Sequence, residues 1–192
     1  MGKIKEAKPV KLIMGVIACC AGTAEEAEGL LVKKFGSIDA RSAVTPFGFT
    51  DYYENEMGKN LLRVWISFEK LVDPQELAGI KTETNKIEEK LSVGVGFIRP
   101  EGAGLINQAP AKKRRVNLDP GYIDGGKLVL ASTKNYSHRI YLSKGIYAEV
   151  TLIFEKSAFR PLAWTYPDYK SVTALDFLVK ARSRYLAQLK KA

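Results

Sequence analysis

The segment VKLIMGVIACCAGTAEEAEGLLVKKFG, residues 10–36, sets the architecture of the chain. Its first part, residues 10–18, is apolar at positions that point to both faces of a strand, which is typical of a strand in the middle of a sheet covered on its two sides. A helix is predicted directly after it, because Thr23 and Glu26 have the spacing of a capping box and Gly36 stands where a helix needs a left-handed stop. The segment therefore predicts a buried strand followed at once by a helix.

A second strand and a second helix are predicted further along the chain. Residues 61–71, LLRVWISFEKL, alternate between apolar side chains and a face that carries Arg63 and Trp65. Asp73 is placed to cap a helix, and Pro74 suits its first turn. The apolar stripe of that helix consists of Leu77, Ile80, Thr84, Ile87 and Leu91.

The C-terminal part adds a hairpin and a closing helix. The segments HRIYL and GIYAEVTLIFEK are predicted to pair around residues 143–145, with alternate side chains from Ala148 to Phe154 facing the core and Glu149 facing away. With a further strand in residues 37–53, the first part has the order β-α-β-β-α-β of a ferredoxin-like unit. We therefore predict an α+β fold and a single domain over residues 1–192, in which this unit is elaborated by a C-terminal β-hairpin and helices.

Residues 93–113, VGVGFIRPEGAGLINQAPAKK, are rich in Gly, Ala and Pro and show no sustained period. Such a composition is typical of a long surface loop. We predict a flexible loop here, which separates the neutral first part of the chain from a basic second part.

The cysteines and the apolar segments bear on the location of the protein. Cys19 and Cys20 are adjacent, so a bond between them would be strained and would not staple the fold. Reduced thiols favour the cytoplasm. The apolar run at residues 12–18 is at the short limit for a signal peptide, and no stretch approaches the ~18 apolar residues of a membrane span. We expect a cytoplasmic protein that does not enter the membrane.

The net charge of +9 is unevenly distributed. Residues 1–111 contain 14 basic and 15 acidic residues, whereas residues 112–192 contain 16 and 6. Such a concentration of positive charge favours an anionic partner, for example a nucleotide, RNA or an acidic surface. It equally suits a protein that uses the charge only to stay in solution.

The stretch GYIDGGK, residues 121–127, has the G-x-x-x-x-G-K spacing of nucleotide-binding P-loops. Leu128 stands where such loops need Ser or Thr to hold Mg²⁺, and Asp124 places a negative charge where phosphates would bind. The sequence therefore disfavours a P-loop, and with it a GTPase. We predict instead a helix that begins after Pro120 and buries the apolar side chains of residues 128–130.

The densest set of basic and aromatic residues lies in STKNYSHRIYLSKG, residues 132–145, where Tyr136 and Tyr141 are interleaved with four basic side chains. Such a set can clamp a phosphate and stack a base or a sugar. A solvated basic strand edge is an equal alternative. The candidate ligand-binding residues are Arg114, Arg115, Lys134, Arg139 and Lys144, together with His138.

Acid-base chemistry has three candidate residues. An imidazole titrates near neutrality, so His138 would be the acid or base, with Asp119 or Glu149 as the carboxylate. A lone histidine equally suits a structural role. Tyr52 and Tyr53 lie in a loop of high aromatic density that would line a pocket. One histidine and two adjacent cysteines are too few for a zinc site, which leaves Mg²⁺ held by carboxylates as a possible cofactor.

Six segments together resemble a known family. The resemblance is to domain-of-unknown-function family 4416, a prokaryotic family of single-domain proteins, and it covers nearly the whole chain. It implies no reaction and no active site, although some members carry the label GTP-binding protein. Residues 93–113 look longer than the family pattern. The segments are KPVKLIMGVI, PFGFTDYYENEMG, LLRVWISFEKLVDPQEL, RRVNLDPGY, STKNYSHRIYLSKGIYAEVTLIF and PLAWTYPDYKS.

The sequence supports three functional hypotheses. In the first, the basic C-terminal half binds a phosphorylated or otherwise anionic ligand, either a nucleotide or RNA. In the second, the protein is an enzyme that uses acid-base chemistry on a phosphorylated substrate. In the third, the basic face makes the protein an assembly partner. The identity of the ligand, the presence of a reaction and the oligomeric state stay open.

Overall fold

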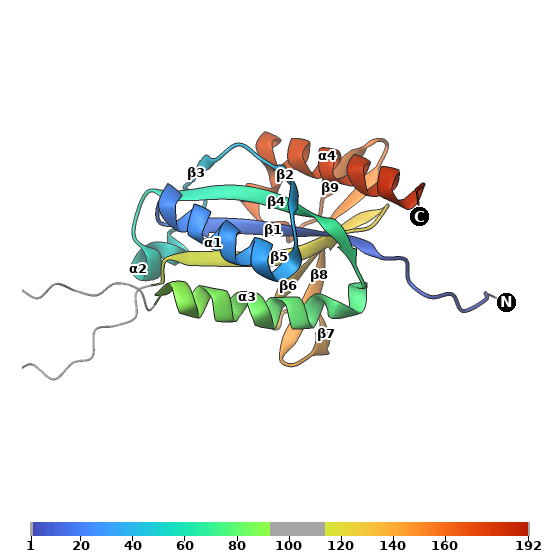
Figure 1. Ribbon diagram of the computed structural model, residues 1–192, viewed down its shortest axis with the longest axis horizontal. Helices are drawn as coiled ribbons and strands as arrows, with labels where there is room; N and C mark the ends of the chain where they lie inside the picture. The colour runs from blue at the N-terminus through green and yellow to red at the C-terminus, as the bar shows by residue number, and fades with distance from the viewer. Residues whose placement is uncertain (1, 93–113, 192) are drawn as a thin grey trace, which may run out of the picture.

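The computed structural model describes residues 2–92 and 114–191, so the loop predicted at 93–113 lies outside the described residues. Its helices and strands are β1 (Val10–Ala18), α1 (Ala21–Phe35), β2 (Ile38–Arg41), β3 (Thr45–Phe47), α2 (Glu54–Met57), β4 (Leu61–Val72), α3 (Leu77–Ser92), β5 (Val116–Ile123), β6 (Lys127–Ser132), β7 (Ile140–Ser143), β8 (Ile146–Glu155), β9 (Ala158–Pro161) and α4 (Val172–Leu189). The nine strands of the described part form one antiparallel sheet, with α1 and α3 on one side and α4 on the other (Figure 1).

The first half of the chain forms the predicted ferredoxin-like unit. The strand order is β2-β4-β1-β5-β6-β8-β7, with β3 beside β4 and β9 beside β8. β1 therefore lies between β4 and β5, and β2 pairs with the other side of β4. This arrangement follows from two crossover helices, α1 and α3, each of which leads the chain past one strand. The prediction of an α+β fold is confirmed.

β1 is buried along its whole length, as its apolar sequence predicts. Leu12, Met14 and Val16 pack with α1 and α3 on one face of the sheet. Ile13 packs on the other face with Trp65 and with Phe177 of α4. Both faces of the central strands are therefore covered, which explains why the alternation in β4 has a large aromatic side chain on its second face.

The ends of the helices differ in how well the sequence predicts them. Gly36 ends α1 with φ of 96°, a conformation that glycine adopts without strain, and Asp73 accepts the N–H of Gln75 (2.8 Å) before α3. Cys20, rather than Thr23, is the N-cap of α1 and makes no side-chain capping bond. Thr23 is buried, and its hydroxyl accepts a hydrogen bond from Arg115 (2.8 Å) instead.

The helix predicted after Pro120 is wrong, because residues 116–132 form the β5–β6 hairpin. In its turn, the Asp124 carboxylate accepts the N–H groups of Gly126 (2.8 Å) and Lys127 (2.9 Å) and pairs with the Lys127 ammonium. A short apolar run does not by its period distinguish a buried strand from a buried helix, and β-branched Val129 suits the strand. The P-loop spacing is thus the turn of a hairpin and not a loop that leads into a helix.

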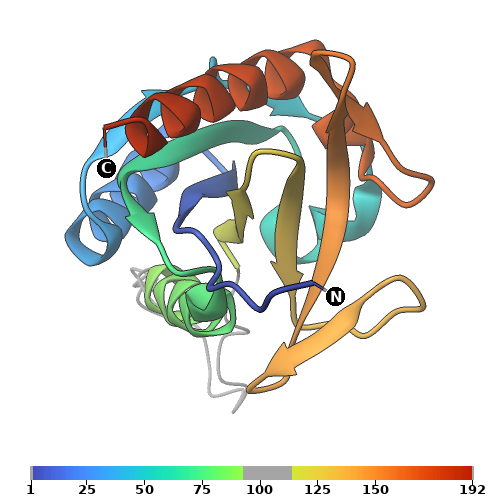
Figure 2. The ribbon, with the colours of Figure 1, turned by 90° about the vertical axis from the view of Figure 1, so that its right-hand side faces the viewer.

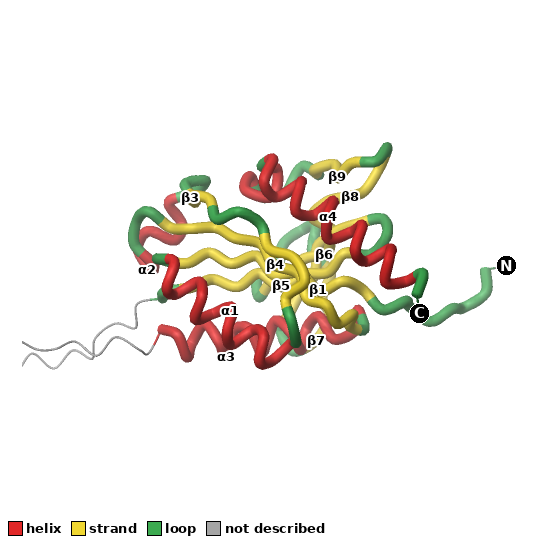
Figure 3. Tube along the Cα trace, turned by 45° about the horizontal axis from the view of Figure 1, so that its top comes forward, coloured by secondary structure: helices red, strands yellow, loops and turns green. Residues whose placement is uncertain are grey.

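The second half of the chain extends the sheet, which is strongly curved when viewed along its strands (Figure 2). β8 pairs with β6 on one side and with both β7 and β9 on the other. The hairpin predicted around residues 143–145 joins β7 to β8, and it projects from the rest of the sheet (Figure 2). The layers are also clear in Figure 3, where α1 and α3 lie side by side below the sheet and α4 lies above it. Among the described helices, none combines the length and the apolar character needed to cross a membrane.

Candidate ligand-binding site

A pocket of about 820 Å³ opens where β5 and β6 separate. These two strands pair only through residues 121–123 and 128–130, after which β6 continues alone beside β8. The wall of the pocket comes from β4, α3, β5, β6 and β8, from residues 47–53 and from residues 166–169. The volume lies in the range of small-molecule sites, about 300–1,000 Å³.

Side chains of α3 form hydrogen bonds with the backbone groups of β5 that β6 leaves unpaired. Glu88 accepts the N–H of Leu118 (2.7 Å), and Lys81 donates to the carbonyl of Leu118 (2.7 Å). A buried backbone group without a partner costs free energy, so this pair of side chains allows the sheet to stay open here. Two charged residues of α3, Lys81 and Glu88, therefore maintain the pocket.

Arg63 of β4 is the charged centre of the pocket floor. It is 1% exposed, and its guanidinium pairs with Asp119 (3.1 Å) and Asp168 (2.9 Å) and lies against the rings of Trp65 and Tyr169. Burial acts to lower the pKa of Arg63, but Tyr169, Asp168 and Asp119 outweigh it and hold the pKa above its ordinary value. Burial also raises the pKa of Asp168, in spite of Arg63.

Gly15 makes room for this centre. A Cβ at residue 15 of β1 would lie 2.6 Å from the Tyr169 hydroxyl and 2.7 Å from Arg63 Nη2. The guanidinium can therefore lie against the backbone of the central strand only because this position has no side chain.

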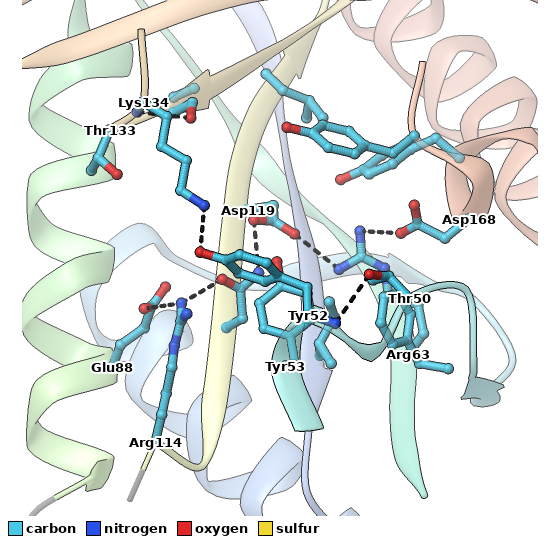
Figure 4. A pocket seen from close by; sticks show the side chains of 18 of the residues that line it. Thr50, Tyr52, Tyr53, Arg63, Glu88, Arg114, Asp119, Thr133, Lys134 and Asp168 are labelled. Atoms are coloured by element: carbon cyan, nitrogen blue, oxygen red, sulfur yellow. Dashed lines mark hydrogen bonds and ion pairs between the residues drawn. The ribbon is translucent and has the colours of Figure 1, made fainter. Parts of the chain in front are cut away.

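The polar network continues from Asp119 along the floor, as Figure 4 shows. Asn117 donates to Asp119 (2.8 Å) and accepts from Arg114, whose guanidinium also pairs with Glu88 (2.7 Å). Burial raises the pKa of Glu88 above its ordinary value, although Lys81 and Arg114 act in the opposite direction. The carboxylates of the floor are thus held in fixed positions by cations and amides.

The mouth of the pocket is aromatic and carries one lysine. Lys134 Nζ donates to the Tyr52 hydroxyl (2.5 Å) and lies 4.1 Å from the centre of the Tyr52 ring (Figure 4). Tyr53 lies deeper and packs edge to face against Tyr52 and Phe47. Burial raises the pKa of Tyr53 well above its ordinary value.

Glu149 of β8 forms part of the pocket wall. The sequence predicted that this side chain faces away from the core. Its carboxylate accepts from Arg139 Nε (2.7 Å), lies 3.1 Å from His138 Nε2 and accepts from the Thr151 hydroxyl (3.3 Å). Glu149 is only 3% exposed, whereas Ala148 and Val150 are half-buried. Ala148 and Val150 pack against an apolar cluster as predicted, but Glu149 on the other face lines the pocket and does not face the solvent.

The predicted site residues fall into three groups. Tyr52, Tyr53, Arg114, Asp119, Lys134 and Glu149 all line the pocket. His138 and Arg139 lie behind Glu149, with the His138 ring stacked on Trp164 at 4.9 Å. Arg115 bonds to Thr23, and Lys144 lies in the exposed turn between β7 and β8, so neither is part of the pocket.

The residues of the polar network that were missed from the sequence are Arg63, Lys81, Glu88, Asn117, Tyr166 and Asp168. A signal existed for Arg63, because a charged side chain two residues from a large aromatic side chain on the same face of a long strand is expected to have buried partners if that face is covered. Asp168 follows Pro167 in an irregular segment, and no periodic pattern there indicates that it meets β4. Glu88 lies next to the apolar stripe of α3 and is indistinguishable in sequence from a solvated helix residue.

The charged side chains that line the pocket are balanced rather than basic. Arg63, Lys81 and Arg114 each pair with a carboxylate, whereas Lys134 has no carboxylate within ion-pair distance among the described residues. In residues 2–92 and 114–191, no group of three His, Cys, Asp or Glu side chains is arranged to hold a metal ion, and the suggestion of Mg²⁺ stays a prediction. Lys134 is therefore the most available anchor for an anion.

The fold and the site define an α+β protein with a ferredoxin-like core whose sheet opens into a polar and aromatic pocket between β5 and β6. The model of a domain of unknown function, DUF4416, matches residues 8–97 and 104–185, and the chain belongs to this family. Comparisons with curated proteins and with solved structures gave no match. The matched ranges include the pocket residues from β4, α3, β5 and β8.

Proposed function

We propose that this pocket binds a small phosphorylated molecule of nucleotide size. The observation that carries the proposal is the position of Lys134, a lysine at an aromatic mouth that faces a floor of fixed carboxylates across a pocket of about 820 Å³. An ammonium that is not neutralised by a carboxylate attracts a phosphate, and a phosphate accepts several hydrogen bonds from it.

The rest of the pocket suits the uncharged part of such a ligand. Asp119 and Glu149 offer carboxylate oxygens that accept from sugar hydroxyls or from an exocyclic amine of a base. Tyr52, Tyr53 and Tyr166 offer rings for packing against a base or sugar. A ligand that is anionic at one end and rich in hydroxyl and amine donors at the other end matches this arrangement.

The balance of charge favours one phosphate over several. Four basic and five acidic side chains line the pocket, so a chain of phosphates on the floor would meet carboxylates. We therefore expect a monophosphate at the mouth rather than a triphosphate inside. The lining residues that carry charge are Arg63, Lys81, Arg114, Lys134, Glu88, Glu89, Asp119, Glu149 and Asp168.

Replacing Lys134 with methionine is expected to weaken binding of a nucleoside monophosphate by roughly 10- to 100-fold, the usual loss for a hydrogen bond to a charged group. Isothermal titration calorimetry against the four ribonucleoside 5′-monophosphates and ribose 5-phosphate, at one low salt concentration, measures this change. Methionine keeps the apolar stem, so the loss reports the ammonium.

Lys127→Met is the matched control, because it removes the same charge from the lysine of the P-loop spacing. Lys127 pairs with Asp124 in the hairpin turn and is not part of the pocket, so affinity is expected to change by less than about twofold. Equal losses from both variants would mean that only net charge matters. An absence of binding by the unaltered protein to every one of these phosphates would reject the proposal.

A further inference from the structure

A second aromatic surface lies outside the pocket. It consists of Tyr136, His138, Trp164 and Tyr166, and we name it the aromatic shelf. The ring centres of His138 and Trp164 are 4.9 Å apart with their planes at 10°, and those of Tyr136 and His138 are 5.3 Å apart. Tyr136 is 66% exposed, Trp164 39% and Tyr166 42%. Large aromatic side chains thus gather at the surface instead of in the core.

The aromatic shelf is continuous with the mouth of the pocket. Tyr166 belongs to both, since it lines the pocket and its hydroxyl accepts from Arg139 (2.5 Å). Arg139 also donates to the carbonyl of Lys134 (2.9 Å), the residue at the mouth. Arg139 and His138 both contact Glu149, and His138 stacks on Trp164, so a chain of direct contacts joins the mouth of the pocket to Trp164.

Hydrogen bonds hold Trp164 in place, and the residue stays 39% exposed with the His138 ring stacked on its indole. Its indole N–H donates to the carbonyl of Val150 (2.8 Å), and the neighbouring Thr165 hydroxyl donates to the carbonyl of Thr151. These bonds cap the edge of β8 between β7 and β9. A ring fixed in this way loses little conformational entropy when a planar group stacks on it.

The charge of this region points to a polyanion. Among residues 132–171, one exposed side chain is acidic, Glu155, and five are basic. The two other acidic side chains in the same range, Glu149 and Asp168, are buried. The exposed basic residues are Lys134, Lys144, Lys156, Arg160 and Lys170.

We infer that the nucleotide of the pocket is one unit of a single-stranded nucleic acid, and that a neighbouring base stacks on Trp164 of the aromatic shelf. This inference rests on the proposed function. Exposed rings beside a basic surface are the means by which proteins bind single strands without reading the sequence, because every base has a face that can stack. The bases of a duplex are already stacked on one another, so a duplex does not fit.

The test first compares the affinity for an oligonucleotide with that for a mononucleotide, and then removes the ring of Trp164. Fluorescence anisotropy with labelled single-stranded RNA and DNA of about ten nucleotides is expected to show affinity at least about tenfold higher than that of the mononucleotide. Trp164→Ala is expected to weaken oligonucleotide binding by roughly 5- to 100-fold and to leave mononucleotide binding unchanged. A difference in affinity between the RNA and the DNA strand would show that the sugar 2′-hydroxyl contributes to binding.

Trp164→Phe is the control for folding, because it keeps an aromatic ring but loses the bond to Val150. It is expected to retain most of the oligonucleotide affinity, and Tyr136→Ala to have a smaller effect than Trp164→Ala. Mononucleotide binding with no gain from a longer strand, tight duplex binding, or oligonucleotide binding that does not depend on Trp164 would each overturn the inference and leave the proposed function in place. Failure of both mononucleotides and oligonucleotides to bind would reject the proposed function and this inference together.

Discussion

Replacing Arg63 with methionine is expected to lower the free energy of unfolding by about 3–5 kcal/mol, the usual cost of removing one partner from a buried ion pair. The guanidinium is 1% exposed, and its partners Asp168 and Asp119 have side chains that are 7% and 28% exposed. Methionine keeps an apolar stem beside Trp65 and Tyr169, so the loss of stability comes mainly from the missing charge and not from packing. Urea denaturation at neutral pH measures it.

The pH dependence separates this explanation from a simple packing defect. Burial already raises the pKa of Asp168, and Arg63 is the largest of the groups that oppose burial, so the pKa rises further without Arg63. A carboxyl group whose pKa is higher in the folded than in the unfolded state contributes stability at low pH that is lost as the pH rises through the folded-state pKa. The deficit of the variant is therefore expected to be smaller near pH 4 than near pH 7.

Two further variants serve as controls for Arg63→Met. Adding Asp168→Asn is expected to recover part of the loss, because it removes one of the carboxylates left unpaired. Arg41→Met breaks an exposed pair with Glu28 and is expected to cost less than about 1 kcal/mol. A deficit that is equal at both pH values and is not reduced by Asp168→Asn would contradict the role of Arg63 as the partner of these carboxylates.

The ferredoxin-like half of the fold could be predicted because its signals are local. The apolar run of β1, the left-handed position of Gly36 and the cap at Asp73 each act over a few residues, and the topology follows from their order. The hairpin at residues 119–132 could not be predicted in the same way. Its apolar run is too short for its period to separate strand from helix, and the pairing with β8 that settles it comes from residues about twenty positions away.

The candidate site could be predicted only in part, because a sequence shows which side chains are charged but does not show which of them form ion pairs in the fold. Lys134, Arg114 and Asp119 were chosen for their chemistry, and the fold brings them to one pocket. The pairing of Arg114 with Glu88 depends on how α3 packs beside β5, a long-range contact with no local signal. The same applies to Glu149, where polar alternation in β8 has the pattern of a solvated face although that face lines the pocket.

Gly121→Ala is expected to lower the free energy of unfolding by about 3 kcal/mol or more, at or above the upper end of the usual cost of overpacking. A Cβ at residue 121 of β5 would lie 2.4 Å from the carbonyl oxygen of Val129 and 2.5 Å from Leu130 Cδ2. The first of these atoms belongs to the backbone of β6, so it cannot move away without opening the three-residue pairing that joins the two halves of the sheet. Thermal and urea unfolding measure the loss.

Gly126→Ala is the matched control, since residue 126 is the second glycine of the P-loop spacing and has no positive φ. The nearest atom to a Cβ there is Asp124 Oδ1 at 3.8 Å, an ordinary contact, so stability is expected to change by no more than about 0.5 kcal/mol. In a P-loop, both glycines would let the backbone approach phosphate, and either substitution would reduce nucleotide binding without unfolding the protein. In the hairpin, Gly121 is required for the fold and Gly126 is replaceable. This assignment would be wrong if Gly121→Ala were stable and if Gly126→Ala folded but no longer bound the monophosphates.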